Sequence, residues 1–469
     1  MNRKINIVVF WSAIFLFTAC ATYYQKTIAF QQDFSRGDLN SAKSFLEKNE
    51  KAAEKKDRLL YFFDRGVVEH MLGNYQESNQ YFEEAYKFSQ DFRKSLMNDF
   101  TSYIANPMTK PYQGEDFEVV LLHFYKALNY IYLYEYDAAL VECRRINIRL
   151  NEINDRYEDK KNRYKSDAFA HLLMGLIYEA KREYNDAFIA YRNAYNTYEE
   201  LYSEHFNMNA PLQLKKDLLR MAVINGFSTE VDFYERRFDL KYDKAWESEE
   251  GSLVFFWLNG LGPVKSEVSL NFAGSKNQGG VFTFADEQNG FSVPVVASDY
   301  NSKGDLGDVK AVRMAIPKFK SRYPIFNEAN ILLNSQKYEL QKVEDINEIA
   351  IATLQDRTLR ELASSVGRLA VKQATELAVR EKNEDLGALV SVVNAATEKA
   401  DTRNWQTLPH SIYYQKVPLD TGLNELKLIP KAPKGASDTL NFKIQSDGIG
   451  VQFFNYHSLE SGPPMEVNR

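Results

Sequence analysis

Residues 168–194 read AFAHLLMGLIYEAKREYNDAFIAYRNA, and small and aromatic residues recur in this segment at helical spacing. Gly175 and Ala187 occupy the eighth and twentieth places, where two helices that cross closely need small side chains. Large rings fill the space between the helices, at Tyr178, Tyr184 and Tyr191. The segment therefore predicts two consecutive helices that pack against each other.

Two further segments carry the same spacing. One opens at Val120, and a more degenerate one opens at Leu59, with Glu69 where an aromatic residue is expected. A weaker match surrounds residues 38–42. The spacing resembles the tetratricopeptide repeat, a pair of helices that stacks side by side into an array. This resemblance implies an α-helical repeat domain over residues 20–245.

The inner groove of such an array is lined by the fifth and ninth places of each first helix. Here these places are apolar and hold Phe63, Val67, Phe124, Leu128, Leu172 and Leu176. A helix that is apolar on its groove face as well as its packing face must be buried on both. We therefore expect the groove to be filled by another part of the chain, by a partner helix or by an acyl chain.

The character of the sequence changes near residue 246. Strand and turn patterns predict a β-rich part over residues 246–344 and a second one over residues 401–460. Between them, a helical period from residue 345 to about 382 predicts one long helix, which is the best internal candidate to lie in the groove. An apolar run at 386–396 completes the segment 345–400 and is too short to span a bilayer.

The predicted fold class is thus α+β. An amino-terminal α-helical, tetratricopeptide-like repeat domain precedes a mostly antiparallel β domain, which one long helix interrupts. The strands are expected near residues 253–258, 266–272, 281–284, 293–297, 312–316, 331–333, 411–418, 425–429, 440–445 and 451–456.

The amino terminus has the features of an export signal. Arg3 and Lys4 precede an apolar run, and the sequence Phe17-Thr18-Ala19-Cys20 resembles a bacterial lipobox. The resemblance implies removal of residues 1–19 and acylation of Cys20, for example with palmitate, and Ala21 favours the outer membrane. An ordinary signal peptide with a chance cysteine is the alternative. A membrane-spanning helix is disfavoured, because residues 5–17 are shorter than the roughly 20 residues needed.

Charge and motif content argue against several function classes. The chain has 58 Lys and Arg against 64 Asp and Glu residues, with no basic block, so no nucleic acid partner is expected. The six histidines show no ligand spacing, and Cys20 and Cys143 are too few for a thiolate site, so neither a metal nor another cofactor is expected. No catalytic motif is present, and we expect no enzyme.

Three stretches together resemble an uncharacterised family of bacterial envelope lipoproteins with tetratricopeptide-like helices and a carboxy-terminal strand domain. They are residues 116–118 with 141–145, residues 259–265 and residues 401–409. The resemblance implies architecture and location but no activity. Four of its motif residues have no known role: Glu142, Arg145, Arg403 and Trp405. Glu142 and Arg145 are one helical turn apart and can pair, while Arg403 and Trp405 open a predicted strand.

The leading functional prediction is a scaffold for protein–protein interaction, attached to the outer membrane by its lipid and facing the periplasm. Its partner would be an envelope protein that the sequence does not identify. The alternative is a lipoprotein that holds a glycan or a lipid in the apolar groove. Hydrolysis of a cell-wall polymer is a third reading that rests on location alone.

Overall fold

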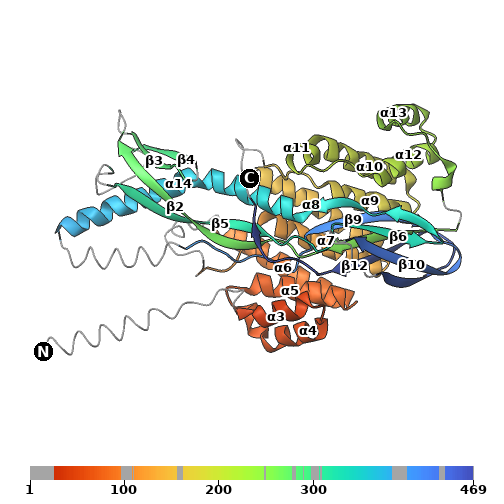
Figure 1. Cartoon of the computed structure of the whole chain (residues 1–469), viewed down its shortest axis with the longest axis horizontal. Helices are drawn as coiled ribbons and strands as arrows, with labels where there is room; N and C mark the ends of the chain where they lie inside the picture. Colours follow the sequence, from red (N-terminus) through yellow and green to blue (C-terminus); the bar gives the residue numbers. More distant parts are fainter. Residues whose placement is uncertain are drawn as a thin grey trace.

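The computed structural model describes residues 26–96, 108, 110–155, 162–247, 250–276, 281–288, 290–296, 306, 309–382, 399–431 and 439–467. Within these ranges the amino-terminal half is helical and the carboxy-terminal half consists of strands interrupted by one long helix (Figure 1). This confirms the predicted α+β class. Cys20, the predicted signal segment 1–19 and the apolar run 386–396 lie outside the described residues. No described helix is both long and apolar enough to cross a bilayer.

Ten helices of the described part form five successive pairs. They are α3 (Ile28–Ser35), α4 (Leu39–Lys48), α5 (Arg58–Met71), α6 (Tyr75–Leu96), α7 (Asp116–Tyr132), α8 (Tyr136–Asp155), α9 (Ala168–Ala180), α10 (Tyr184–Thr197), α12 (Leu212–Ile224) and α13 (Ser228–Phe238). Shorter helical turns are η1 (Glu50–Glu54), η4 (Tyr198–Tyr202), α11 (Ser203–His205) and η5 (Lys244–Trp246).

The same turn joins the two helices of every pair. One residue with a positive φ stands two residues after the first helix ends and two before the second begins. In chain order these residues are Gly37, Gly73, Tyr134, Arg182 and Gly226. The recurrence of this left-handed position shows that α3–α4 and α12–α13 repeat the unit of the three predicted pairs.

Small residues at the eighth place allow the helices of a pair to cross closely. A Cβ atom added to Gly66 of α5 would lie 2.6 Å from the ring of Phe82 on α6. Gly175 of α9 is covered in the same way by Tyr191 of α10. Glycine is therefore required at both positions by packing.

The strands form three sheets. They are β1 (Ser252–Asn259), β2 (Val264–Lys276), β3 (Val281–Asp286), β4 (Phe291–Val296), β5 (Ala311–Ser321), β6 (Glu328–Leu333), β7 (Gln336–Glu339), β8 (Gln341–Asp345), β9 (Ser411–Pro418), β10 (Gly422–Lys431), β11 (Leu440–Ser446), β12 (Val451–Ser458) and β13 (Met465–Glu466). The inner sheet has the order β12-β1-β9-β8, the outer sheet β11-β10-β6-β7, and the distal sheet β13-β5-β2-β3-β4. Most pairs are antiparallel, but β1 and β12 are parallel.

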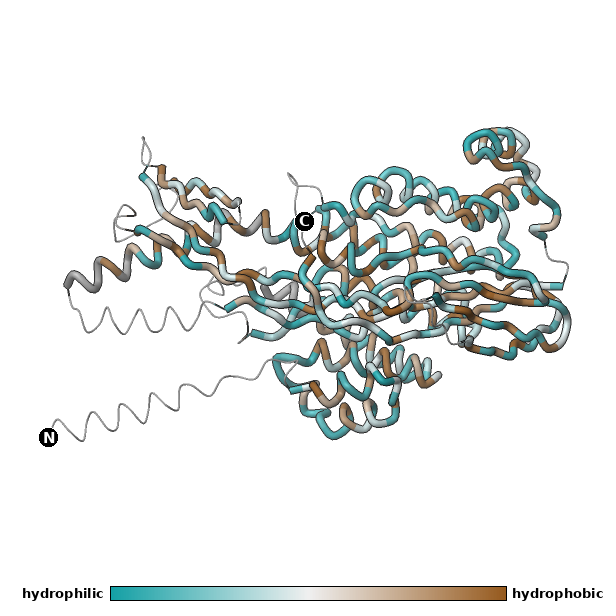
Figure 2. Tube along the Cα trace, in the orientation of Figure 1, coloured by the Kyte–Doolittle hydropathy of each residue, from teal (hydrophilic) through white to brown (hydrophobic). Residues whose placement is uncertain are grey.

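The inner sheet is a middle layer between the helical repeats and the outer sheet. Every residue of β1 is buried. Its even-numbered apolar residues, Val254, Phe256 and Leu258, join the core formed with the helices. Its odd-numbered apolar residues, Leu253, Phe255 and Trp257, join a second core with the outer sheet. Figure 2 accordingly shows hydrophobic segments along the strands in the middle of the molecule.

The long helix α14 (Ile346–Lys382) links two cores. Its first turns, with Ile346, Ile349 and Ala350, pack in the core of the repeats, whereas Val366 and Ala370 pack against the distal sheet. Figure 1 shows that α14 and strands β2–β5 project together from the rest of the molecule. The expectation that this helix lies in the repeat groove is therefore wrong for most of its length.

Three short strands escaped the sequence patterns: β7, β8 and β13. Strand β13 lies beyond residue 460, where the predicted β-rich part ends, and pairs with β5. A second difference concerns Arg403 and Trp405, which were expected to open a strand. They lie in an irregular segment, and β9 begins only at Ser411.

Candidate functional site

The six residues expected to line the inner groove are all buried by the chain itself. Phe63, Val67, Phe124, Leu128, Leu172 and Leu176 are each at most 2% exposed. The ring of Phe63 stacks on Trp405 at 4.1 Å between centroids, while Phe124 reaches the inner sheet through Phe169 and Phe256. The inner sheet and the segment around Trp405 therefore fill the groove, and it offers no room for the glycan or lipid of the alternative prediction.

Buried charges join the repeats to the inner sheet. Glu179 of α9 accepts hydrogen bonds from Arg220 of α12 and from Lys416 of β9. Burial alone raises the pKa of Glu179, but the two cations lower it overall. Asp217, which pairs with Arg220, accepts a hydrogen bond from the Tyr414 hydroxyl at 2.5 Å. Each of these charges has a partner, so the cluster fixes the sheet on the helices.

The motif residues Arg403 and Trp405 have a similar anchoring position. Arg403 pairs with Asp401 and with Asp57, which precedes α5. The backbone N–H of Trp405 donates to Glu118 Oε1 of α7 at 2.6 Å. Burial raises the pKa of Glu118 to about 7. These contacts hold the segment around Trp405 over the inner groove of the repeats.

The other two motif residues lie on α8. Glu142 Oε1 accepts a hydrogen bond from Arg145 at 2.8 Å, and Glu142 Oε2 lies 2.6 Å from His123 Nδ1. Lys126 of α7 completes the cluster at 3.0 Å from Glu142. His171 of α9 is not part of this cluster. The described residues contain no group of three His, Cys, Asp or Glu side chains that could hold a metal ion.

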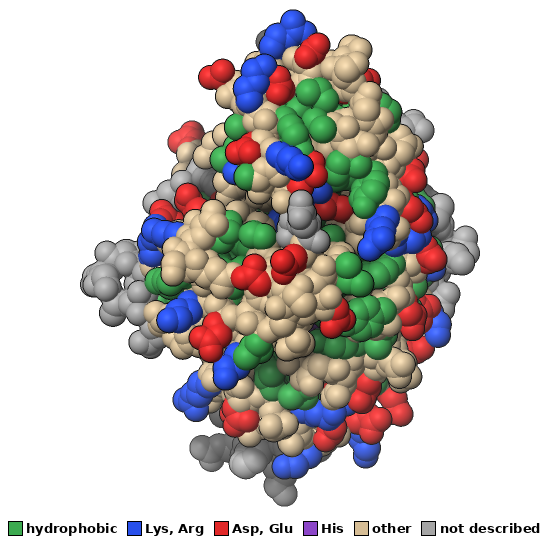
Figure 3. All heavy atoms as spheres, turned by 90° about the vertical axis from the view of Figure 1, so that its right-hand side faces the viewer, with side chains coloured by type: hydrophobic (Ala, Val, Ile, Leu, Met, Phe, Trp, Pro, Cys, Tyr) green, Lys and Arg blue, Asp and Glu red, His purple; other side chains and the backbone are tan. Residues whose placement is uncertain are grey.

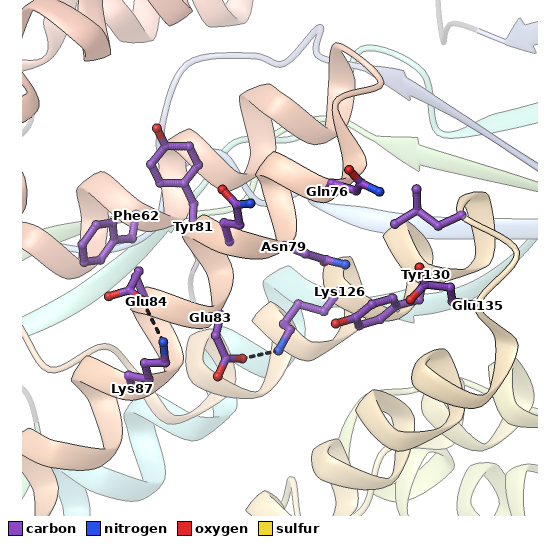
Figure 4. A pocket seen from close by; sticks show the side chains of 12 residues that line it. Phe62, Gln76, Asn79, Tyr81, Glu83, Glu84, Lys87, Lys126, Tyr130 and Glu135 are labelled. Atoms are coloured by element: carbon purple, nitrogen blue, oxygen red, sulfur yellow. Dashed lines mark hydrogen bonds and ion pairs between the residues drawn. The ribbon is translucent and has the colours of Figure 1, made fainter.

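An open groove lies instead between α6 and α7, where the second helix pair meets the third (Figure 4). Its volume is about 760 Å³, and a hollow of about 550 Å³ adjoins it through shared lining residues. The main groove is lined by Phe62, Gln76, Asn79, Gln80, Tyr81, Glu83, Glu84, Lys87, Lys126, Tyr130, Leu133 and Glu135. We call it the α6–α7 groove. Because α6 presents polar residues at three- and four-residue intervals, one helix face supplies most of the lining.

Asn79 is the central residue of this groove. It is 8% exposed, and its Oδ1 accepts a hydrogen bond from Asn129 Nδ2 at 2.9 Å. Asn129 is itself oriented by His70, whose Nδ1 lies 2.6 Å from Asn129 Oδ1. This fixes the Asn79 amide with its nitrogen free, and that nitrogen has no hydrogen-bond partner among the described residues. A buried donor without a partner is costly, which makes it a place for a ligand or a water molecule.

The charges of the α6–α7 groove are mostly paired within it. Lys126 binds Glu83 at 2.7 Å, and Lys87 binds Glu84 at 2.9 Å (Figure 4). The exposed carboxylate of Glu135 has no such partner in the described part of the chain. The adjoining hollow adds Glu77, so the two together contain four carboxylates and two ammonium groups.

Other exposed apolar side chains are dispersed over the surface. Examples are Phe233 on α13 and Leu423 at the start of β10. Figure 3 views the end of the molecule that carries α12 and α13 and shows hydrophobic side chains in several groups separated by charged ones.

Comparison with known proteins gives a partial likeness. No protein-family profile and no curated protein sequence match the chain. Among solved structures, the apo form of RapI is 20% identical, covers 46% of this chain and 68% of its own, and has a TM-score of 0.32. MamA is 14% identical over 44% of this chain and 91% of its own, with a TM-score of 0.28. BtubC from P. vanneervenii is 13% identical over 46% and 77%, with a TM-score of 0.33. Each likeness covers less than half of this chain.

Proposed function

We propose that this protein is a scaffold anchored to the bacterial envelope that binds a protein partner through the α6–α7 groove. The observation that carries this proposal is that the inner face of the repeat array is filled, whereas a groove on another face is open. The inner face, which holds ligands in an open array, is occupied by the inner sheet and Trp405. The α6–α7 groove remains open and contains a buried amide donor without a partner.

The proposed location follows from the amino-terminal sequence. Acylation of Cys20 would attach the chain to the outer membrane, where the repeats would face the periplasm. Labelled palmitate tests this directly. Incorporation should be lost in Cys20→Ser and kept in Cys143→Ser, since Cys143 is fully buried. Label that persists in Cys20→Ser would refute the anchor.

A binding role without catalysis is also part of the proposal. Burial raises the pKa of two carboxyl groups, Glu118 and Glu344, which are both fully buried. Glu118 hydrogen-bonds to Tyr112 and Trp405, and Glu344 hydrogen-bonds to Tyr202. None of these residues lines the α6–α7 groove. Their role is to hold the layers together.

Site-specific photocrosslinking in living cells tests the partner. p-Benzoylphenylalanine would replace Gln80 in the groove or, as a matched control, the 55% exposed Ile148 on α8. We expect a discrete adduct from position 80 that is absent from position 148, and mass spectrometry would identify the bound protein. The proposal fails if position 80 yields no adduct, or the same adducts as position 148.

A further inference from the structure

The α6–α7 groove has a chemical selectivity that follows from its lining. Three carboxamides, Gln76, Asn79 and Gln80, lie at i, i+3 and i+4 on α6 and therefore share one face. Each carboxamide offers both donors and an acceptor. An extended peptide backbone presents N–H and C=O groups in alternation, and a row of amides can match them without reading the side chains.

Asn79 sets the polarity of one of these contacts. Its oxygen is already used by Asn129, and only its nitrogen is available. The ligand must therefore supply an acceptor at this point, and a peptide carbonyl is an acceptor of the right strength and size. Figure 4 shows the Asn79 side chain projecting from α6 toward the side chains of α7, between Gln76 and Lys126.

The charge of the site favours a basic ligand. Lys126 and Lys87 are occupied by Glu83 and Glu84, which leaves Glu135 as an unpaired carboxylate at the groove. In the adjoining hollow, Glu77 contacts Arg65 only at 3.3 Å and Lys43 at 4.0 Å. An incoming Lys or Arg gains the unpaired carboxylate of Glu135, and Glu77 adds negative charge nearby, whereas an acidic residue would meet only cations that are already paired.

We propose that the α6–α7 groove binds an extended peptide segment that carries a Lys or Arg residue, with Asn79 donating to its backbone and Glu135 pairing with its cation. This inference rests on the proposed function and specifies the chemistry of the partner. The groove volume of about 760 Å³ falls within the roughly 300–1,000 Å³ of sites that enclose ligands.

Selection from a phage-displayed library of random 12-residue peptides tests the inference with the purified full-length protein. Enriched peptides would be synthesised with a fluorescein label, and their affinity measured by fluorescence anisotropy. We expect enriched sequences to contain Lys or Arg. An absence of enrichment, or enrichment of peptides without a basic residue, would overturn the inference.

Three variants then locate the binding. Asn79→Asp keeps the acceptor for Asn129 and removes the free donor, and we expect at least tenfold weaker binding. Glu135→Gln should weaken binding severalfold and reduce its salt dependence. Gln80 is exposed, so Gln80→Ala should weaken peptide binding without disturbing the packing of a buried site. The matched control Ile148→Ala should bind as the wild type does, and equal affinity in all variants would place the peptide elsewhere.

The outcomes separate this inference from the proposed function. An adduct at position 80 in cells, together with selected peptides that lack basic residues, refutes the peptide chemistry and leaves the scaffold role standing. Basic peptides that bind in an Asn79-dependent manner, without any adduct at position 80 in cells, refute the scaffold role and support the peptide chemistry.

Discussion

Trp405 lies face to face on Phe63, with 4.1 Å between ring centroids and 13° between ring planes. Phe63 belongs to the first helix of a repeat, and Trp405 belongs to the segment that follows the long helix. The contact joins the two halves of the chain at the centre of one core, in which both side chains are at most 1% exposed. We therefore expect the repeats and the strands to unfold together, as one unit.

Replacement of Trp405 should destabilise the whole chain. Trp405→Ala removes a fully buried ring that contacts Phe63, Phe82 and Tyr125, and such truncations cost about 3–5 kcal/mol. Urea unfolding followed by circular dichroism measures the loss. Trp246→Ala, at a half-buried position in η5, is the control and should cost much less. A Trp405→Ala protein in which only the strands melt early would contradict a single folding unit.

Glycine at the helix crossing should be irreplaceable. Gly66→Ala places a methyl group 2.6 Å from the Phe82 ring, and overpacking of this kind costs about 1–3 kcal/mol. Alanine is intrinsically better than glycine in a helix by about 1 kcal/mol, so the clash must exceed this gain. We expect a net loss of stability in thermal unfolding. The double variant Gly66→Ala/Phe82→Leu should recover part of it, and a stabilised single variant would show that the crossing has room.

Acid should weaken the interface that helices α5 and α7 form with strand β12. Asn455 contacts the Nε2 atoms of both His70 and His457, at 3.1 and 3.0 Å. Burial lowers the pKa of His70 to about 4, even though its hydrogen bond to Asn129 opposes this, and also lowers that of His457. Both are therefore neutral in the folded protein near pH 6.

The sign of the effect follows from proton linkage. Below pH 6.5 the unfolded chain binds protons that the folded chain excludes, so stability is complete above pH 6.5 and falls toward pH 4. The loss attributable to His70 is about 3 kcal/mol at the acid end. Burial raises the pKa of Glu118 to about 7, and this group gives the opposite slope. The comparison of wild type with His70→Gln isolates the histidine, and identical pH profiles would refute its contribution.

Hydrogen exchange should alternate along β12. Ser252 donates to the Gly450 carbonyl and Gly260 to that of Ser458, which fixes the parallel ladder between them. The amides of even-numbered residues 452–458 then donate to β1, and those of odd-numbered residues 451–457 point away from it. We expect slow exchange at the even positions and fast exchange at the odd ones, measured by mass spectrometry with electron-transfer fragmentation. Uniform protection would indicate a further strand at this edge.

The sequence predicted the elements better than their mutual arrangement. Glycine and aromatic spacing predicted the three central helix pairs because these contacts are local, as in Gly66 with Phe82. Three strands of the inner sheet, β1, β9 and β12, were also predicted, but the parallel pairing of β1 with β12 was not, since residues far apart in the chain share no local pattern. Arg403 and Trp405 were expected to open a strand, but Trp405 lies in an irregular segment, and its stacking on Phe63 depends on the assembled core.

The α6–α7 groove was not predicted at all. Its only local signal is the polar stripe on α6, with Gln76, Asn79 and Gln80 on one face. Most polar stripes simply face water. The groove exists because α6 and α7 stand apart at this face, and that separation is a property of tertiary packing. The free nitrogen of Asn79 follows from contacts with Asn129 and His70, which lie on two other helices.

Strand β12 completes the inner sheet. The folded protein can therefore become stable only after β12 has been synthesised. The inner faces of the helix pairs are made early, yet their cover includes β1, Trp405 and β12, and the last of these is synthesised close to the carboxyl end. We expect Phe63, Phe124 and Leu172 to stay partly exposed until β1 and the segment around Trp405 have been synthesised and packed against them. Such long-range pairing slows folding and produces intermediates that are prone to aggregation. Loss of β12 would remove the strand that pairs with β1 and would leave that edge of the inner sheet open.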